Sequence, residues 1–337
     1  KDAGKVQKTK FKHVSEMLEG TRCISVKEGL PKIGADPKHT PKIESGGNPI
    51  ELARKLALDG YQTVTVNAAS AYHAGGGFTS GGRHALEEAL CSQSTLFASL
   101  EKVQAATAKH AGDRHIPEDG IILSPNVELF RGISTRGYPV SPDTVKLAGV
   151  VSVAMYNFNN DVYDSPTDNI KDEAYKLGVK KKMQAMVHGA VMAGADAVIV
   201  PDVGCGVFKN DPRVVGKIVG EVMQKYQGYF RKIVFTGKHE FCGEAQQALR
   251  QEIQTQTKDR TPVTLVDDFP LLPLQLPKVD GTWEWIGKKN DSEHRKMRLE
   301  DQDRLRLAFR KHGYAVKDAG TVQKTKFKHV SEMLEGT

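Results

Sequence analysis

A glycine-rich stretch between a strand-like run and a helix constrains the fold of this chain more than any other feature. Residues 61–67 alternate as a strand and end at Asn67, and three successive glycines follow at 75–77. A helix then begins that carries the adjacent carboxylates Glu87 and Glu88, and another helix, capped by Asn48, precedes the strand. Helix, strand, glycine loop and helix in that order predict an α/β fold whose ligand loops leave the strand ends.

Apolar runs farther along the chain extend the same sheet. A short strand and a tight turn are predicted within residues 121–131. Nearly continuous apolar composition is typical of internal strands in a parallel sheet. Three runs of this kind predict buried strands, at residues 149–156, 195–201 and 232–236.

Two long helices complete this part of the pattern. Apolar residues recur at helical spacing over 168–193, and again after Asp211 and Pro212, which are suited to a helix cap and a first turn. The lysine run 180–182 inside the first helix is interpreted as its solvated face, with a phosphate contact as the alternative.

Composition bounds the compartment and the ligand class. The chain has 337 residues, a formal net charge of +7 and four widely spread cysteines without a CxxC pair. We therefore expect free thiols in a reducing compartment, with no metal site and no cofactor. The positive charge fits an anionic ligand, although a merely solvated surface explains it equally well. No apolar run reaches the length of a membrane span and no leader peptide is visible, so we expect a cytoplasmic (with or without cytoskeletal association) or nuclear protein, neither secreted nor bound to membrane.

The two ends of the chain carry the same segment. Residues 1–21 return at 317–337 with an offset of 316, and the only mismatch is Lys5 against Thr321. Chance does not produce such a match, and a copied tag would not differ at one position. We therefore interpret the chain as one period, plus a short overlap, of a tandem array. The expected partners are then neighbouring repeats of the same polypeptide, with filament or cytoskeletal assembly as a further expectation.

Two glycine loops are the best candidates for a binding site. The first is Gly75, Gly76, Gly77 and Phe78, and the second is Gly204, Cys205, Gly206, Val207 and Phe208. Each leaves a strand and enters a helix, so together they could clasp one diphosphate with backbone amides and helix N-termini. A flexible turn is the alternative for either loop alone. Phe208 is a candidate to stack on ribose or adenine or, equally, to anchor its loop, and Cys205 is interpreted as a small loop residue, since no histidine lies near it to activate a nucleophile.

These motifs resemble a known family. The run NAASAYHAGGGFTSGGRHALEEALCSQSTLF is similar to the core of the microbial-type poly(ADP-ribose) glycohydrolases, which are macrodomains. Further matching pieces follow in the same order: LSPNVELFR, NFNN, HGAVMAGADAVIV and VGCGVFKNDP. The resemblance covers roughly residues 45–242 and implies a three-layer α/β/α macrodomain-like fold with a mixed sheet.

The resemblance also implies roles for individual residues. Glu88 matches the catalytic carboxylate, Glu87 its partner that holds the ribose, and Asn67 the strand-end residue that contacts ribose. The two glycine loops match the diphosphate loops. Glu88 would protonate the departing ribose hydroxyl and then activate water, which requires a pKa raised by burial. The family's glutamine before the paired glutamates is Leu86 here, so recognition of the polymer or turnover is expected to be reduced.

A second, weaker resemblance concerns the chain ends. The run GTWEWI, followed by a helical pattern and by AVKDAGTVQKTKFKHVSEM, looks like a WWE domain, a small α+β module that binds poly(ADP-ribose). The predicted organisation is the C-terminal half of a WWE-like module copy at 1–28, a linker at 29–47, the macrodomain at 48–267, a proline-rich linker at 268–279 and a WWE-like module at 280–337.

Two functions follow from the sequence. One is an enzyme that hydrolyses ribose–ribose linkages of poly(ADP-ribose) within a tandem-repeat protein, favoured by the paired glutamates and both glycine loops. The other is a catalytically weak or inactive macrodomain repeat that acts as a scaffold component or an ADP-ribose reader, favoured by the repeat itself.

Overall fold

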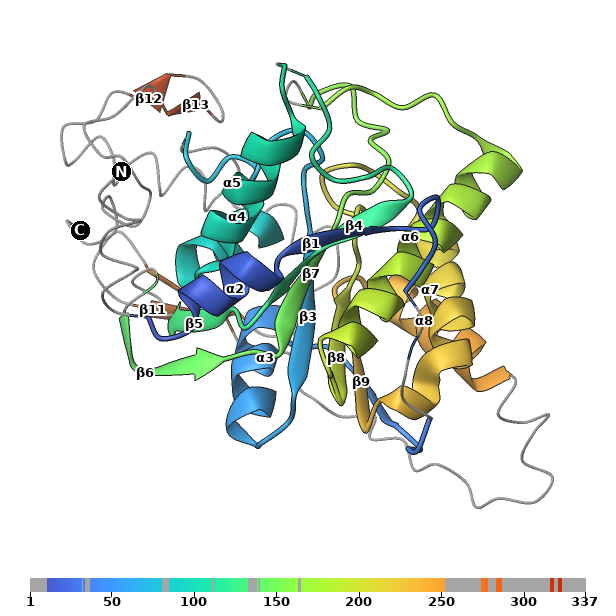
Figure 1. Ribbon diagram of the computed structural model, residues 1–337, viewed down its shortest axis with the longest axis horizontal. Coiled ribbons are helices and arrows are strands. Elements are labelled where there is room, and N and C mark those ends of the chain that lie inside the picture. The colour runs from blue at the N-terminus through green and yellow to red at the C-terminus, as the bar shows by residue number, and fades with distance from the viewer. Residues whose placement is uncertain are drawn as a thin grey trace.

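A seven-stranded mixed sheet forms the centre of the protein (Figure 1). The computed structural model describes residues 11–251, apart from 32, 34–36, 81–84, 111, 133–137, 139 and 163–164, together with 274–277, 283–286, 316–317 and 321–322. The strand order is β1-β4-β7-β3-β8-β9-β2. The strands span β1 (Arg22–Ser25), β2 (Lys42–Ser45), β3 (Thr63–Ala68), β4 (Gly120–Pro125), β7 (Gly149–Val153), β8 (Ala197–Pro201) and β9 (Lys232–Thr236).

The direction of the strands confirms a mixed sheet. Strands β7, β3, β8, β9 and β2 pair in parallel, whereas β4 is antiparallel to both of its neighbours, β7 and β1. The strands predicted at 61–67, 149–156, 195–201 and 232–236 are confirmed as β3, β7, β8 and β9. Their apolar runs lie in the interior of the sheet, as their near-continuous composition predicts.

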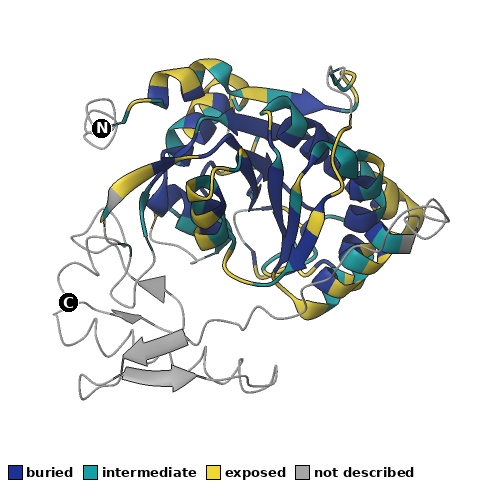
Figure 2. Ribbon diagram, turned by 90° about the horizontal axis from the view of Figure 1, so that it is seen from below, coloured by how far each residue is buried: buried dark blue, intermediate teal, exposed yellow. Residues whose placement is uncertain are grey.

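Helices cover both faces of the sheet and make three layers. On one face lie α2 (Val14–Gly20), α3 (Pro49–Leu58), α4 (Leu86–Gln93) and α5 (Leu96–Thr107). On the other lie α6 (Asp172–Met192), α7 (Pro212–Tyr226) and α8 (His239–Gln251), with a short 3₁₀ turn, η1 (Gln227–Tyr229), after α7. Alternate residues of one strand enter opposite cores, as Val151 and Val150 of β7 do. Figure 2 shows the buried residues concentrated along the strands and the inner sides of the helices.

Capping residues position the helices that follow the strands. Asn48 Oδ1 accepts hydrogen bonds from the amides of Ile50 and Glu51, and Asp211 accepts one from Arg213 N. These contacts satisfy amides that have no partner inside a helix. Both helix starts predicted from the sequence are confirmed.

The lysine run of α6 is placed differently from the prediction. Lys182 has no exposed surface. Its amine donates to Glu118 O and lies 4.6 Å from the centre of the Tyr156 ring, and burial lowers its pKa to about 8. Helical spacing places Lys182 beside the core residues Val179 and Met183, so the prediction of a solvated face is wrong at this position.

The folded body begins earlier in the chain than predicted. Strand β1 pairs with β4, with Cys23 opposite Ile122, and β2 pairs with β9, with Lys42 opposite Lys232. Residues 22–25 and 42–45, predicted to lie in a module copy and a linker, are therefore outer strands of the central sheet. Strands of four residues among glycines and prolines show too little alternation to be recognised in the sequence.

Smaller hairpins lie outside the central sheet. Strands β5 (Glu128–Arg131) and β6 (Val140–Lys146) pair antiparallel, and the Arg54 guanidinium joins them to α3 by hydrogen bonds to four groups of the hairpin. Strand β10 (Leu274–Pro277) pairs with β11 (Trp283–Ile286), and β12 (Val316–Lys317) with β13 (Thr321–Val322). The helical pattern predicted after GTWEWI, at residues 299–312, lies outside the described residues. Among the residues that are described, no helix has the length and apolarity needed to span a membrane.

Candidate active site

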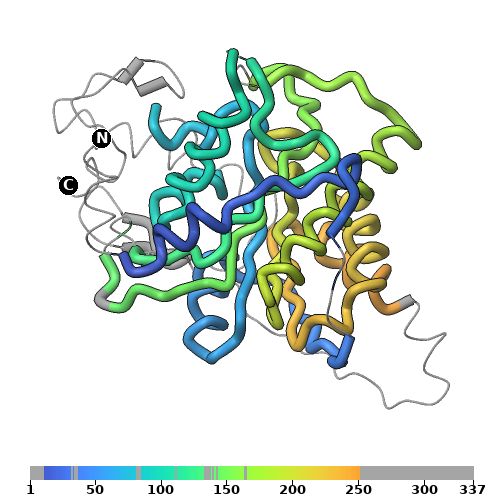
Figure 3. Tube along the Cα trace, viewed as in Figure 1, coloured from blue at the N-terminus to red at the C-terminus, as the bar shows by residue number. Residues whose placement is uncertain are grey.

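Three adjacent parallel strands bring the predicted site residues to one edge of the sheet. Strand β3 lies between β7 and β8 and runs parallel to both. The chain leaves each of these strands at the same edge, where ligand loops of α/β proteins lie (Figure 3). The loop after β3 leads to α4 with its paired glutamates, and the loop after β8 carries Gly204 to Phe208.

Asn67 anchors the first side of this site. It is fully buried, stands opposite Ser152 of β7, and donates from Nδ2 to Ser152 Oγ at 3.1 Å. Its side chain also lies near Glu87 and lowers the pKa of that carboxyl. Asn67 therefore links the strand end to the first of the two glutamates.

Glu87 is a buried carboxyl held by the loop that follows β3. It is 3% exposed and accepts hydrogen bonds from Ser70 N at 2.7 Å and Gly75 N at 3.2 Å. Burial raises the pKa of Glu87 to about 8, and the nearby Glu88 adds to the rise, while the hydrogen bonds to the carboxyl oppose it. Burial therefore favours the protonated form of Glu87.

Glu88 is half-buried and is held at both carboxyl oxygens. Oε1 accepts a hydrogen bond from Gly77 N at 2.8 Å, and Oε2 accepts one from Ala85 N at 3.0 Å. Ala85 is the residue that precedes the first turn of α4. The second bond satisfies an amide at the start of the helix. The carboxylate that the family resemblance marks as catalytic is thus fixed in orientation by backbone groups, yet less buried than Glu87.

The three successive glycines wrap around these two carboxyls. A Cβ atom on Gly76, which has a φ of +56°, would lie 2.6 Å from Glu88 Oε1 and 3.3 Å from Glu87 Oε2. Both carboxyls therefore face the same small volume beside Gly76. The amides of Gly75 and Gly77 donate to the glutamates, and the amide of Gly76 donates to His73 O. The prediction that these amides are free to cradle a diphosphate is not met in this structure, because each already has an acceptor.

The second loop offers the free amides that the first does not. In the described part of the chain, the amides of Gly206, Val207 and Phe208 have no hydrogen-bond acceptor. The buried Asn210 ties this loop to the segment after β7, donating to Tyr156 O at 2.7 Å and to Gly204 O at 3.0 Å. Successive unpaired amides just before a helix N-terminus suit an anionic group.

The aromatic and sulfur side chains of the two loops pack against the protein and hold the loops in place. The Phe78 ring lies 5.0 Å from that of Phe97 on α5, and Phe208 is half-buried against the larger core. Cys205 is 1% exposed, and burial raises the pKa of its thiol to about 12. A thiol in this state is a poor nucleophile, so Cys205 could meet a ligand only through its backbone.

Several residues of the site were not identified from the sequence. Ser70 and Gln104 fix the loop after β3: Ser70 Oγ accepts from the amides of Tyr72 and His73, and Gln104 bonds both Ala74 N and Tyr72 O. Ser70 is a small polar residue two positions after the end of β3, which was an available signal, whereas Gln104 lies on a distant helix and offered none.

Tyr138 is the other unpredicted neighbour of the paired glutamates. Burial raises the pKa of its hydroxyl, and the charge of Glu88 adds to the rise. It lies between β5 and β6, far from α4 in the sequence, so only the fold brings it near the site.

The hollow of about 440 Å³ on this part of the surface is separate from the carboxyl pair. It is lined by Tyr72, His73 and residues at the end of α5, and neither Glu87 nor Glu88 contributes to its wall. Within the described residues, no three His, Cys, Asp or Glu side chains are grouped as ligands of a metal ion would be.

Comparisons with known proteins identify similar sequences and folds. Residues 3–132 match the family model of the microbial-type PARG (poly(ADP-ribose) glycohydrolase) catalytic domain. No curated protein sequence matches the chain. The poly(ADP-ribose) glycohydrolase of Thermomonospora curvata superposes with a TM-score of 0.58 at 26% identity, covering 71% of this chain and 88% of the bacterial one.

Two further solved structures have the same fold. One is the Thermomonospora curvata enzyme bound to the inhibitor ADP-HPD, with a TM-score of 0.54 at 25% identity, covering 71% of this chain and 88% of that one. The other is the Deinococcus radiodurans enzyme in complex with ADP-ribose, with a TM-score of 0.55 at 23% identity, covering 73% of this chain and 99% of that one. The folded body is thus an α/β domain with the fold of the poly(ADP-ribose) glycohydrolases, and its first part matches their microbial-type catalytic domain.

Proposed function

We propose that this chain is a poly(ADP-ribose) glycohydrolase-like hydrolase that cleaves ribose–ribose linkages. The observation that carries the proposal is the pair Glu87 and Glu88, two carboxyls that converge beside Gly76 at the carboxyl end of β3. The match of residues 3–132 to the PARG catalytic domain supports it, as does the fold shared with glycohydrolases solved with ADP-ribose.

The two carboxyls divide the chemistry between them. Because the pKa of Glu87 is raised to about 8, the pair holds at least one proton at neutral pH, which the first step requires. In that step the half-buried Glu88 passes the proton shared by the pair to the ribose oxygen that leaves, both carboxyls are then ionised, and the C–O bond at the anomeric carbon breaks with oxocarbenium-like character. Glu88 then accepts a proton from the attacking water, while Glu87 holds the ribose.

The two loops would bind the rest of the ligand unequally. The free amides of Gly206, Val207 and Phe208 and the N-terminus of α7 suit the diphosphate. The loop of Gly75 to Gly77 instead holds the carboxyls. This assignment explains why two glycine-rich loops are needed when only one carries phosphate.

The test is release of ADP-ribose from labelled polymer by the wild type and by Glu88→Gln, which keeps the shape of the side chain but cannot transfer a proton. Turnover should fall by about 10²–10⁴-fold in the variant, the usual contribution of general acid–base catalysis. Leu86, half-buried at the start of α4, cannot make a polar contact to the polymer, so Leu86→Gln should raise turnover. Equal turnover by Glu88→Gln and the wild type would refute the assignment.

A second candidate function rests on the repeat of residues 1–21 at 317–337. The same body could serve as a structural unit or an ADP-ribose reader in a tandem array, with little or no hydrolysis. Micromolar binding of ADP-ribose without turnover would favour the reader, and absence of binding would favour the scaffold. The WWE-like module proposed within 280–337 is expected to be structural or to bind only weakly, and tight binding of poly(ADP-ribose) by the full chain that is lost in Trp285→Ala would contradict this expectation.

A further inference from the structure

The segment repeated at the two chain ends is a structural part of the folded body. Helix α2, at residues 14–20, packs against α5 and β4. Its Met17 side chain is fully buried and Val14 is 5% exposed. Thr21 Oγ1, just after the helix, lies 2.8 Å from Ser99 Oγ of α5. The groove that receives α2 is therefore matched to particular side chains of residues 11–21.

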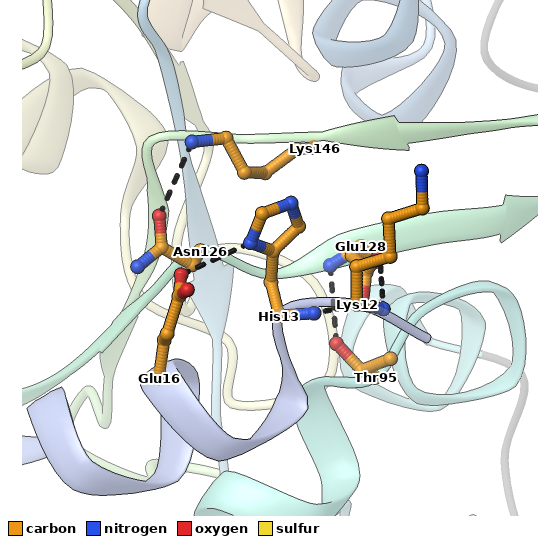
Figure 4. A network of polar contacts seen from close by, with 7 residues as sticks. All are labelled: Lys12, His13, Glu16, Thr95, Asn126, Glu128 and Lys146. Carbon is orange, nitrogen blue, oxygen red and sulfur yellow. Dashed lines mark hydrogen bonds and ion pairs between the residues drawn. The ribbon is translucent and has the colours of Figure 1, made fainter. Parts of the chain in front are cut away.

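A buried carboxylate fixes the beginning of the same segment (Figure 4). Glu128 of β5 is 4% exposed and accepts from the amides of Lys12 at 3.3 Å and His13 at 3.1 Å. Its own amide donates hydrogen to Thr95 Oγ1 at 3.0 Å, which holds β5 against the start of α5. Burying a carboxylate without hydrogen-bond donors is costly. The groove therefore requires backbone amides at the position of Lys12 and His13.

The end of the segment is equally specific. A Cβ atom on Gly20 would lie 2.7 Å from the Pro125 ring, so a larger residue does not fit there without movement. The ring of Phe11 lies 4.8 Å from that of Phe130. The groove thus selects an aromatic residue, a buried valine and methionine, and a glycine at fixed spacing.

Residues 327–337 repeat this set without a single change. They read FKHVSEMLEGT, as residues 11–21 do, and the one mismatch of the longer repeat, Lys5 against Thr321, lies outside this part. Phe327, Val330, Met333, Gly336 and Thr337 stand where the groove requires Phe11, Val14, Met17, Gly20 and Thr21. A helix of this length is not stable alone in water, so the second copy needs a groove of the same kind.

We propose that residues 327–337 dock as the first helix on a second copy of this body, in the groove between α5, β4 and β5. The groove of this body is filled by its own residues 11–21, so residues 327–337 dock on a neighbouring body in which that first helix is displaced or missing. Successive bodies are then joined head to tail, and the unit that repeats begins with α2. Residues 11–21 and 327–337 accordingly belong to the hydrolase-like body and to no WWE-like module.

The test uses two versions of the full chain. The acceptor chain carries Met17→Asp and Met333→Asp, which weaken its own α2 and disable its own second copy. The donor chain is the wild type, whose groove is full and whose residues 327–337 are intact. Mixing the two should give a one-to-one complex by light scattering after size exclusion, whereas a donor with Met333→Asp should bind at least about tenfold more weakly.

A disulfide reports the docking site directly. Because Thr21 meets Ser99, Ser99→Cys in the acceptor and Thr337→Cys in the donor should form a cross-link under mild oxidation. Donors without Thr337→Cys measure the background of the four native cysteines. Circular dichroism checks that the acceptor is folded, and Met17→Ala with Met333→Ala replaces the aspartate pair if it is not.

Either of two results would overturn the proposal. One is the absence of complex and of cross-link with a folded acceptor. The other is equal association of the wild-type donor and the Met333→Asp donor, since it would place the contact elsewhere. Neither result bears on hydrolysis, which is measured separately.

Discussion

Gly76 gives the sharpest test of the carboxyl pair. A methyl group added there should both strain the backbone and displace a carboxylate, and a control glycine separates the two effects. Gly76→Ala places a Cβ atom 2.6 Å from Glu88 Oε1, and the backbone there has a φ of +56°. Gly60 has a φ of +88° with nothing within 4 Å of the corresponding Cβ atom. Gly60→Ala therefore carries the cost of the left-handed backbone without the clash and is the matched control.

The magnitude follows from the contacts. A left-handed backbone costs an L-residue about 1–2 kcal/mol, so both variants should lose this much stability. In Gly76→Ala the Glu88 oxygen must also retreat by about 0.8 Å to reach an ordinary van der Waals separation, which breaks or stretches its 2.8 Å bond from Gly77 N. Loss of a hydrogen bond to a charged group adds about 1.5–3 kcal/mol.

The effect on activity should be larger than the effect on stability. A displacement of about 1 Å in a reacting group can cost about 10²-fold in rate. We expect Gly76→Ala to lose about 10²-fold in polymer hydrolysis and Gly60→Ala to keep wild-type turnover, each measured beside urea unfolding. If Gly76→Ala matches Gly60→Ala in both turnover and stability, the reasoning that the glycine makes room for the carboxyls is refuted.

Three further predictions concern buried polar groups. Because the pKa of Glu87 is raised from 4.5 to about 8, its stabilising protonation is lost as pH rises through this range. The free energy of unfolding of the wild type should therefore fall relative to Glu87→Gln by about 1.4 kcal/mol per pH unit between about pH 5 and 8, and parallel urea-unfolding curves would contradict the raised pKa. Lys182→Met should cost about 1–3 kcal/mol in urea unfolding because it removes the buried donor, whereas Lys181→Met should change stability by less than about 0.5 kcal/mol, and equal losses would mean that burial of the amine is unimportant. Asn210→Asp withdraws the donors that hold Gly204 O and adds a charge beside the proposed diphosphate loop, so ADP-ribose should bind at least about tenfold more weakly by calorimetry, and an unchanged dissociation constant would remove this loop from the site.

The sequence was sufficient to predict the inner sheet and the helix that carries Glu87 and Glu88. Strands such as 149–153 and 197–201 are continuous apolar runs, and capping residues such as Asp211 mark the helix starts locally. Signals of this kind lie within one short segment, so they can be recognised without knowledge of the fold.

What the sequence could not supply depends on contacts between distant segments. Short outer strands such as β1 are defined by their partners, with Cys23 paired to Ile122, and not by their own pattern. The burial of Lys182 depends on the Glu118 carbonyl and the Tyr156 ring, which lie far from it in the chain. Similarly, only the fold shows that the amides of Gly75 and Gly77 are occupied by the glutamates.

The two outermost strands have a consequence for copies of this body held close together. Sheets exposed at their edges can pair with one another, and tethering identical domains raises their local concentration into a range where such pairing competes with correct folding. Strands β1 and β2 are only four residues long, and each begins with an exposed basic residue, Arg22 or Lys42. The edge strand of a second copy, brought alongside, could form only a few backbone hydrogen bonds and would meet a basic residue of the same charge as its own. Short, basic outer strands would thus let identical bodies at high local concentration fold independently without exchanging strands.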